Sequence, residues 1–180
     1  MTNEERARLY PIILSEYNPE WPQWFQEEKE RLLHFIGAET ITRITHIGST
    51  AVPSLTAKPT VDILLEISEN ADIDKLVASL PSDDYICLSK QTIPTFDLAL
   101  LLKGYTPTGF TEKVYHIHVR RVGDWDEVRF CEYLRSHSEI TDAYAALKRE
   151  LKERFEHDRD GYTNAKGDYI NSITERARSI

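Results

Sequence analysis

Residues 45–67 place a Gly-Ser turn ahead of an acid inside an apolar strand, and these residue types suit phosphate and metal binding. Gly48 can adopt a positive φ that brings backbone N–H groups close to a phosphate, and the hydroxyls of Ser49 and Thr50 are further donors. Asp62 has apolar neighbours, so its carboxylate needs a cation or hydrogen bonds to offset burial. We therefore predict a phosphate-binding turn that faces a metal-binding carboxylate.

A second group of polar side chains falls on a strand predicted near residues 114–120. Side chains alternate along a strand, so His116, His118 and Arg120 share one face. Two imidazoles and a guanidinium there indicate either a binding site or a partly exposed sheet face held by hydrogen bonds. Lys58, in the loop before the acid, could contact a phosphate as a point charge or be solvated.

Four other residues have both a functional and a structural interpretation. His46 directly precedes the Gly-Ser turn and could line the site or make a structural hydrogen bond. Asp97 lies on a later predicted strand and could supply another acid if its side chain faces the site. His137 and His157 lie near predicted helix ends, where a capping role is expected rather than metal ligation.

Motifs along most of the chain together resemble the GrpB family of the nucleotidyltransferase superfamily. The Gly-Ser pair followed by Asp62 is similar to the superfamily pattern, and residues 46–62 resemble the GrpB form of it. The other similar motifs are residues 17–21 with Phe25, residues 116–119, residues 130–134 with His137, residues 144–148 and residues 162–166. The resemblance spans about residues 15–175 and implies a nucleotidyltransferase-like fold.

The resemblance also implies a metal-dependent nucleotidyltransferase that uses a nucleoside triphosphate and a small-molecule acceptor, with Mg²⁺ or Mn²⁺ as cofactor. The catalytic groups would be Asp62 and His118, and the metal ligands would be Asp62, Glu66, His116 and His118. The phosphate-binding groups would be Gly48, Ser49, Thr50, Lys58, Arg120, Lys148, Tyr162 and Lys166. The last three are similar to positions at which transferase helices face a triphosphate.

Two residues depart from the family pattern. The usual transferase strand carries a second acid two residues after the first, but that position is Leu64 and the next acid is Glu66. Residues four apart on a strand are separated by ~13 Å, whereas paired catalytic metals are about 4 Å apart. We therefore do not expect Asp62 and Glu66 to share a metal pair. The second departure is Ser54, which stands where the family usually has glycine.

Leu64 favours an alternative class of function. A chain that has lost the second acid could be a non-catalytic module that binds a nucleotide, a coenzyme A-related phosphate ligand or a partner. Some chains similar to this family are fused to dephospho-coenzyme A kinase, which implies a link to coenzyme A metabolism. A third possibility is a transition-metal or phosphohydrolase site formed by His46, Asp62, His116 and His118.

Hydrophobic periodicity and turn residues predict an α+β fold: a mixed sheet covered by helices on one side, followed by a helical third. We expect one domain over residues 1–180, with the sheet core in residues 15–123 and C-terminal helices in residues 124–178. Strands are predicted at 41–47, 60–67, 84–90, 95–103 and 114–120, with a turn-rich connection at 104–109. Helices are predicted from Asn18 to about Gly37 and at 73–80, 125–135 and 137–157. A capping box is expected at 136–139, between the third and fourth of these helices. Residues 158–161 interrupt the helical pattern, and a last helix follows to about residue 178.

Composition excludes several classes of protein. The 180 residues carry a net charge of −8, which argues against a duplex nucleic-acid partner, because such binding depends on Lys and Arg. No apolar run approaches the ~20 residues of a membrane span, and the N-terminus has no apolar signal core, so we expect a cytoplasmic protein. Cys87 and Cys131 match neither a metal site nor a disulfide framework and are expected to be packing residues.

Overall fold

A computed structural model describes residues 2–90 and 97–180. Its strands are β1 (Ile41–Ile47), β2 (Thr60–Ile67), β3 (Tyr85–Lys90), β4 (Ala99–Thr106) and β5 (Gly109–Arg121). Its helices are α1 (Asn3–Leu9), α2 (Trp21–Ile36), α3 (Ile73–Ser79), α4 (Asp126–Ser136), α5 (Ser138–Arg154) and α6 (Arg159–Arg178), and a 3-10 turn, η1, covers Ser49–Ala51. None of the helices in the described ranges has the length and apolar character needed to cross a membrane.

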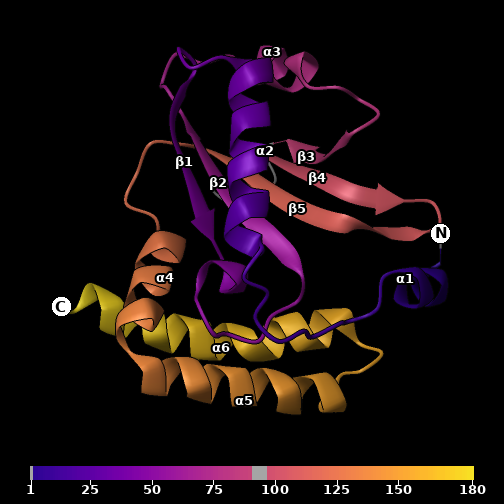
Figure 1. Cartoon of the computed structure of the whole chain (residues 1–180), viewed down its shortest axis with the longest axis vertical. Coiled ribbons are helices and arrows are strands. Elements are labelled where there is room, and N and C mark those ends of the chain that lie inside the picture. The colour runs from indigo at the N-terminus through magenta and orange to yellow at the C-terminus, as the bar shows by residue number, and fades with distance from the viewer. Residues whose placement is uncertain (1, 91–96) are drawn as a thin grey trace.

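The five strands form one sheet in the order β1-β2-β5-β4-β3 (Figure 1). β2 and β5 run parallel, whereas the other neighbouring strands are antiparallel. The mixed sheet and the helices α4 to α6 that follow it confirm the predicted α+β fold with a helical C-terminal third. The parallel pairing of β2 with β5 matters most, because it brings the Asp62 strand beside the histidine strand.

Helices cover both faces of the sheet, so the expectation of a one-sided cover is wrong. On one face, Ile63 and its odd-numbered neighbours on β2 pack against Trp21 and Leu32 of α2. On the other face, Leu64 packs in an apolar cluster with Tyr144 of α5 and with residues of α4 and α6. The C-terminal helices therefore cover the same face of β2 that carries Asp62, and they form one wall of the candidate site.

Several predicted boundaries shift. The first two residues of the strand expected at 95–103 lie outside the described ranges. The observed strand, β4, begins at Ala99 and continues to Thr106, so only two residues separate β4 from β5 rather than the turn-rich connection at 104–109. Tyr105 and Phe110 pair across this hairpin, with ring centroids 5.1 Å apart. Tyr10 also contacts both rings. The aromatic cluster extends the strands into what looked like a loop, because cross-strand packing outweighs local turn propensity.

Helix ends also differ from the sequence pattern. The capping box expected at 136–139 does not form, because the Ser136 hydroxyl donates back to carbonyls of α4 and His137 takes the cap position. The imidazole of His137 stacks on Tyr133, and its Nδ1 lies 2.8 Å from the Tyr133 carbonyl, which agrees with a structural role. α6 begins at Arg159, inside the predicted interruption, where the Asp158 side chain accepts from the Gly161 N–H.

Candidate functional site

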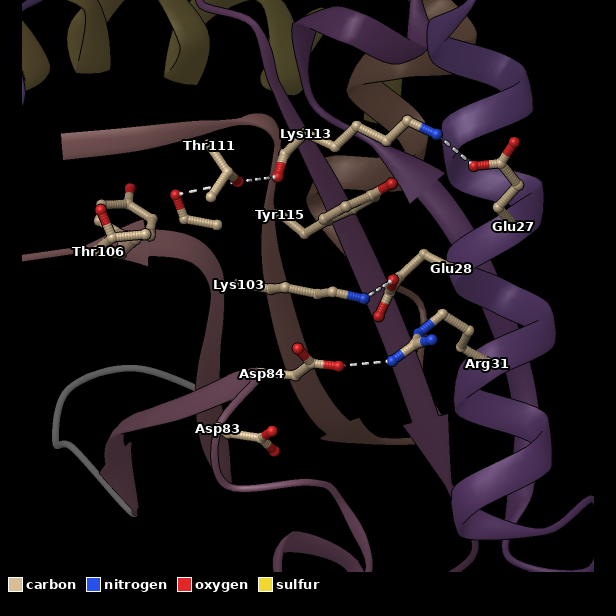
Figure 2. Close-up of a pocket in the computed structure, with 12 residues that line it drawn as sticks. Glu27, Glu28, Arg31, Asp83, Asp84, Lys103, Thr106, Thr111, Lys113 and Tyr115 are labelled. Atoms are coloured by element: carbon tan, nitrogen blue, oxygen red, sulfur yellow. Dashed lines mark hydrogen bonds and ion pairs between the residues drawn. The ribbon is translucent and has the colours of Figure 1, made fainter. Parts of the chain in front are cut away.

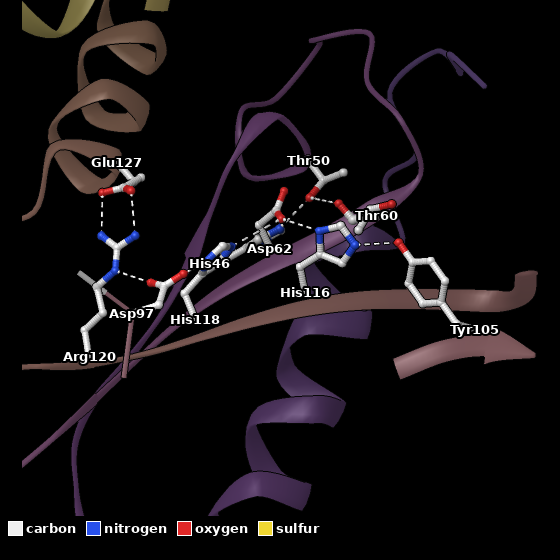
Figure 3. A network of polar contacts seen from close by, with 10 residues as sticks. All are labelled: His46, Thr50, Thr60, Asp62, Asp97, Tyr105, His116, His118, Arg120 and Glu127. Atoms are coloured by element: carbon white, nitrogen blue, oxygen red, sulfur yellow. Dashed lines mark hydrogen bonds and ion pairs between the residues drawn. The ribbon is translucent and has the colours of Figure 1, made fainter. Parts of the chain in front are cut away.

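Asp62 and two histidines meet on one face of the sheet. The register of β2 and β5 sets Asp62 opposite His116 and Leu64 opposite His118. Asp62 Oδ1 lies 3.5 Å from His116 Nδ1 and 3.9 Å from His118 Nε2 (Figure 3). The Asp62 side chain is 29% exposed, so its carboxylate lies at the border between the sheet and the solvent.

Each histidine is oriented by a second partner on its other ring nitrogen. His118 Nδ1 lies 2.8 Å from Asp97 Oδ2, and His116 Nε2 lies 2.6 Å from the Tyr105 hydroxyl (Figure 3). Asp97 therefore reaches the site through His118 rather than facing it directly. These contacts leave His116 Nδ1 and His118 Nε2 as the ring atoms that face Asp62.

Asp62 and His118 hold each other in charged form. Burial alone would raise the pKa of Asp62, but hydrogen bonds and charge from His116 and His118 outweigh it and hold that pKa well below its usual range. Burial alone would lower the pKa of His118, but Asp62 and Asp97 outweigh it and raise that pKa to about 9. At neutral pH the Asp62 carboxylate is ionised and the His118 imidazole is protonated.

Position 48 requires glycine because of its backbone conformation and because Asp62 lies close to it. Its φ of +73° is combined with ψ near −174°, a conformation that side chains rarely adopt. A Cβ built at this position would lie 2.5 Å from Asp62 Oδ2, closer than any real Cβ contact. The group that approaches this turn closely is the Asp62 carboxylate, and the expected approach of a phosphate stays a prediction.

Replacing Gly48 with alanine is expected to destabilise the protein by about 1–3 kcal/mol, since the residue would be strained and would displace Asp62. Gly167→Ala is the matched control, because Gly167 lies in α6 and an added Cβ there meets nothing within 4 Å. That variant should gain about 0.5–1 kcal/mol from helix propensity. Urea unfolding measures both, and equal effects in the two variants would contradict the assigned role of Gly48.

Two lysines from different parts of the chain meet over one aromatic ring. The Nζ atoms of Lys58, in the loop before β2, and Lys166, on α6, lie 5.9 Å and 5.1 Å from the centroid of the buried Tyr162 ring. The pKa of Lys58 is lowered to about 8 by burial and by the charges of Lys166 and Arg159. The pKa of Lys166 is lowered by burial and by Arg159, although Asp62 works in the opposite direction.

A third lysine lies deeper, beside the Gly-Ser turn. Lys148 on α5 is 2% exposed, and its Nζ donates to Ser49 Oγ at 2.5 Å and to the Thr56 carbonyl at 2.8 Å. Within the described residues, neither this lysine nor the two beside Tyr162 forms an ion pair with a carboxylate. The positive charges of Lys58 and Lys166 are therefore poorly neutralised by the protein itself, which is the electrostatic condition for binding an anion.

Thr50 and His46, two other candidate site residues, contact groups of the framework. The Thr50 hydroxyl donates to the Thr60 carbonyl and lies 2.9 Å from His46 Nε2. The His46 ring stacks on Phe25, on the side of the sheet that α2 covers, and burial lowers its pKa to about 4. Both side chains brace the Gly-Ser turn.

The structure does not bring Glu66 or Arg120 to the lysines. Glu66 is 0% exposed and is paired with Arg43, and it also accepts from the Gly123 N–H. Arg120 is buried, with its guanidinium held by Asp97 and Glu127. These partners occupy the charged groups that were expected to bind metal and phosphate.

Leu64, the position of the missing acid, is fully buried in the cluster beneath the C-terminal helices. A carboxylate there would enter an apolar core instead of joining Asp62. Ser54, the other departure from the family pattern, has a φ of +68°, a conformation that favours glycine and tolerates serine at some cost.

The residues present fit a divalent cation only in part. Within the described residues, no group of three or more His, Cys, Asp or Glu side chains is arranged to hold a metal ion. A protein-built pair of Mg²⁺ or Mn²⁺ ions does not fit, because Asp97 and Glu66 are committed to other partners. Asp62 alone can offer a carboxylate, which suits a Mg²⁺ ion whose other ligands are nucleotide phosphates and water.

A cavity of about 440 Å³ lies between α2 and the strands β4 and β5 (Figure 2). Its charged groups are arranged differently from the lysines beside Tyr162. Its basic groups are paired: Lys103 with Glu28, Lys113 with Glu27 and Arg31 with Asp84. The positive charges of this cavity are therefore neutralised by carboxylates of the protein itself. Size alone would favour it as a binding site, but the unneutralised lysines lie elsewhere.

Sequence reasoning missed two contributors to the site. Arg159, the first residue of α6, affects the pKa of Lys58 and of Lys166. Tyr105 reaches His116 from the strand that was expected to end before it. No local pattern identifies either residue, because the packing of α6 and the long β4-β5 hairpin bring them into place.

The model of the GrpB protein family matches residues 11–176. The chain belongs to the GrpB family. The UPF0157 protein YqkA of Bacillus subtilis is 32% identical over 178 residues, which cover 94% of this chain and 49% of YqkA. The UPF0157 protein PA4798 of Pseudomonas aeruginosa is 34% identical over 97% of this chain and 69% of its own length. This chain thus spans about half the length of YqkA and 69% of the length of PA4798.

Structural similarity points to the same family. The crystal structure of the conserved protein GrpB from Enterococcus faecalis has a TM-score of 0.79 at 29% identity, and the match covers 92% of this chain and 96% of that one. A chain of the E. coli MS115-1 CdnC:HORMA-deltaN complex has a TM-score of 0.46 at 14% identity, covering 77% of this chain and 54% of that one. A similarity as low as the second says nothing about ligand or activity.

Proposed function

We propose that this GrpB-family protein binds a nucleoside triphosphate or a related phosphate-bearing small molecule beside Tyr162. The observation that carries the proposal is the convergence of Lys58 and Lys166 on one ring, with Arg159 near and no carboxylate paired to either lysine among the described residues. Ammonium groups in a half-buried site attract phosphate oxygens more strongly than exposed ones do.

A small cavity next to the lysines supports an organic portion for this ligand. It has a volume of about 160 Å³, and its charged lining residues are Lys58, Arg159 and Glu112. Its apolar side chains include Ile12, Phe110 and Val114. A lining that combines basic and apolar groups suits a phosphate ester whose organic group enters the cavity. Nucleotides and coenzyme A-related molecules both have this composition.

Isothermal titration calorimetry with ATP, GTP, CTP, UTP, coenzyme A and inorganic phosphate tests the proposal. We expect at least one organic phosphate to bind, with an affinity that falls as the salt concentration rises, because the contacts are charged. Absence of binding by all of these compounds at low salt, to a protein shown to be folded, would contradict it.

The second candidate function is nucleotidyl transfer assisted by Mg²⁺ or Mn²⁺. The observation that favours it is the position of the ionised Asp62 carboxylate, which borders the same lysines and influences their pKa values. A cation bound there would neutralise charge on a leaving diphosphate. Asp62 would hold the cation and His118 would keep the carboxylate in place, while the lysines would orient the triphosphate.

Asp62→Asn separates binding from metal-assisted transfer. If transfer is the function, Mg²⁺ should tighten ATP binding to the wild-type protein, and the nearly isosteric asparagine should abolish that increase while metal-free affinity changes little. Calorimetry in EDTA and in Mg²⁺ measures the increase. If the wild-type protein binds ATP with the same affinity with and without Mg²⁺, the proposal of nucleotidyl transfer is contradicted, and the proposal of phosphate-ligand binding stands.

A further inference from the structure

Ser49 and Lys148 form a close pair near Lys58 and Lys166, which together are called the lysine cluster. Lys148 Nζ lies 2.5 Å from Ser49 Oγ, and the lysine side chain has no carboxylate partner among the described residues. Ser49 is half-buried at the first position of η1, directly after the left-handed turn at Gly48. A hydroxyl on a sharp turn beside a buried amine is the arrangement by which a Ser-Lys pair activates a nucleophile.

We propose that Ser49 is a nucleophile with Lys148 as its general base, and that it attacks phosphorus of the bound triphosphate to form a nucleotide-serine ester. This inference rests on the proposed function, because the triphosphate must bind beside Ser49 first. The lysines near Tyr162 hold the phosphate charge, whereas Lys148 contacts the serine and the Thr56 carbonyl. The phosphate-binding role first expected of these residues is thereby extended to bond formation.

The step balances without an added oxidant or reductant. Ser49 Oγ forms a bond to the α-phosphorus, and the bond from that phosphorus to the bridging oxygen breaks. Diphosphate leaves with the electron pair, and the serine proton moves to the amine of Lys148. An acceptor hydroxyl or water then attacks the same phosphorus, Ser49 Oγ leaves and regains its proton from Lys148, and the proton of the acceptor passes to solvent.

The surroundings of Lys148 keep its amine available as a base. The pKa of Lys148 is lowered to about 6 by burial and by the charges of Lys166 on α6 and Lys58 in the loop before β2. Asp62 on β2 and Cys131 on α4 work in the opposite direction. The Tyr144 ring, whose centroid is 4.5 Å from Lys148 Nζ, carries a hydroxyl whose pKa burial raises, so this group stays neutral.

A fluorophosphonate probe tests the nucleophile without a bound nucleotide, because it reacts at phosphorus with activated serine hydroxyls. We expect labelling of the wild-type protein at Ser49, mapped by peptide mass spectrometry, and none in Ser49→Ala. Lys148→Met and Lys148→Arg should both slow labelling by roughly 10²-fold or more, because neither residue can accept the proton. The wild-type rate should rise with pH as Lys148 loses its proton and then level off.

Two further measurements complete the test. Calorimetry shows whether ATP binds, and intact-protein mass spectrometry after incubation with ATP and Mg²⁺ shows whether the protein is covalently modified. A gain of one AMP group in the wild type that is absent in Ser49→Ala supports the inference. If ATP binds but neither ATP nor the probe modifies Ser49, the inference is overturned and the proposed function stands. If the probe labels Ser49 but no triphosphate binds, the nucleotide-serine ester is overturned, and the proposed function fails as well only if coenzyme A and inorganic phosphate also do not bind. Equal labelling rates in the wild type and both folded Lys148 variants overturn the role of Lys148.

Discussion

Replacing both Lys58 and Lys166 with methionine is expected to weaken binding of the phosphate ligand by about 10²- to 10⁴-fold, here measured with ATP. Each lysine would lose a charge-assisted hydrogen bond of about 1.5–3 kcal/mol. Methionine keeps the apolar stem that packs near Tyr162 and removes an unneutralised charge from a half-buried place. The folded state should therefore be at least as stable as that of the wild type.

Lys75→Met with Lys113→Met is the matched control for this pair of substitutions. Lys75 is exposed on α3, and Lys113 pairs with Glu27 in the cavity between α2 and the strands. The net charge therefore changes by the same amount, at two side chains that do not line the small cavity beside Lys58. ATP affinity should stay within a few-fold of the wild-type value. Calorimetry with urea unfolding measures both properties, and a similar loss of affinity in the two double variants would show that only net charge matters.

ATP binding is also expected to take up protons near pH 8. The pKa of Lys58 is lowered to about 8 by burial and by the charges of Lys166 and Arg159, and a phosphate beside it would raise that pKa again. The bound state then holds more protons than the free state, so affinity is highest below about pH 8 and decreases as pH rises above it. The limiting slope is about tenfold per pH unit for each proton taken up.

Titrations at pH 8 in two buffers that differ in ionisation enthalpy measure this uptake as a difference in apparent heat. His118 also titrates near this range, with a pKa of about 9, so Lys58→Met is needed to identify the group. That variant should lose part of the difference. Equal heats in both buffers for the wild type would contradict proton uptake by the lysines.

The part of the site carried by paired strands could be predicted from the sequence. The alternation of His116 and His118, combined with the expectation that their strand lies near that of Asp62, already implied one shared face, and the β2-β5 register places all three together. Gly48 was likewise identifiable from its residue type. These features follow from local periodicity, which the sequence displays directly.

Features that depend on distant partners could not be predicted. Glu66 shares the face of Asp62, but Arg43 from the neighbouring strand occupies its carboxylate. Arg120 is held by Asp97 and Glu127, and the local sequence does not reveal these pairings. The covering of a second sheet face by α4 to α6 similarly depends on helix packing across the molecule.

A crystal structure with a non-hydrolysable ATP analogue tests the central claim most directly. The account predicts phosphate oxygens within hydrogen-bonding distance of the Lys58 and Lys166 amines, with the rest of the ligand toward the cavity bordered by Arg159. Phosphates bound instead in the groove of Lys103 and Lys113, or a lysine cluster left without a ligand at saturating concentration, would contradict it.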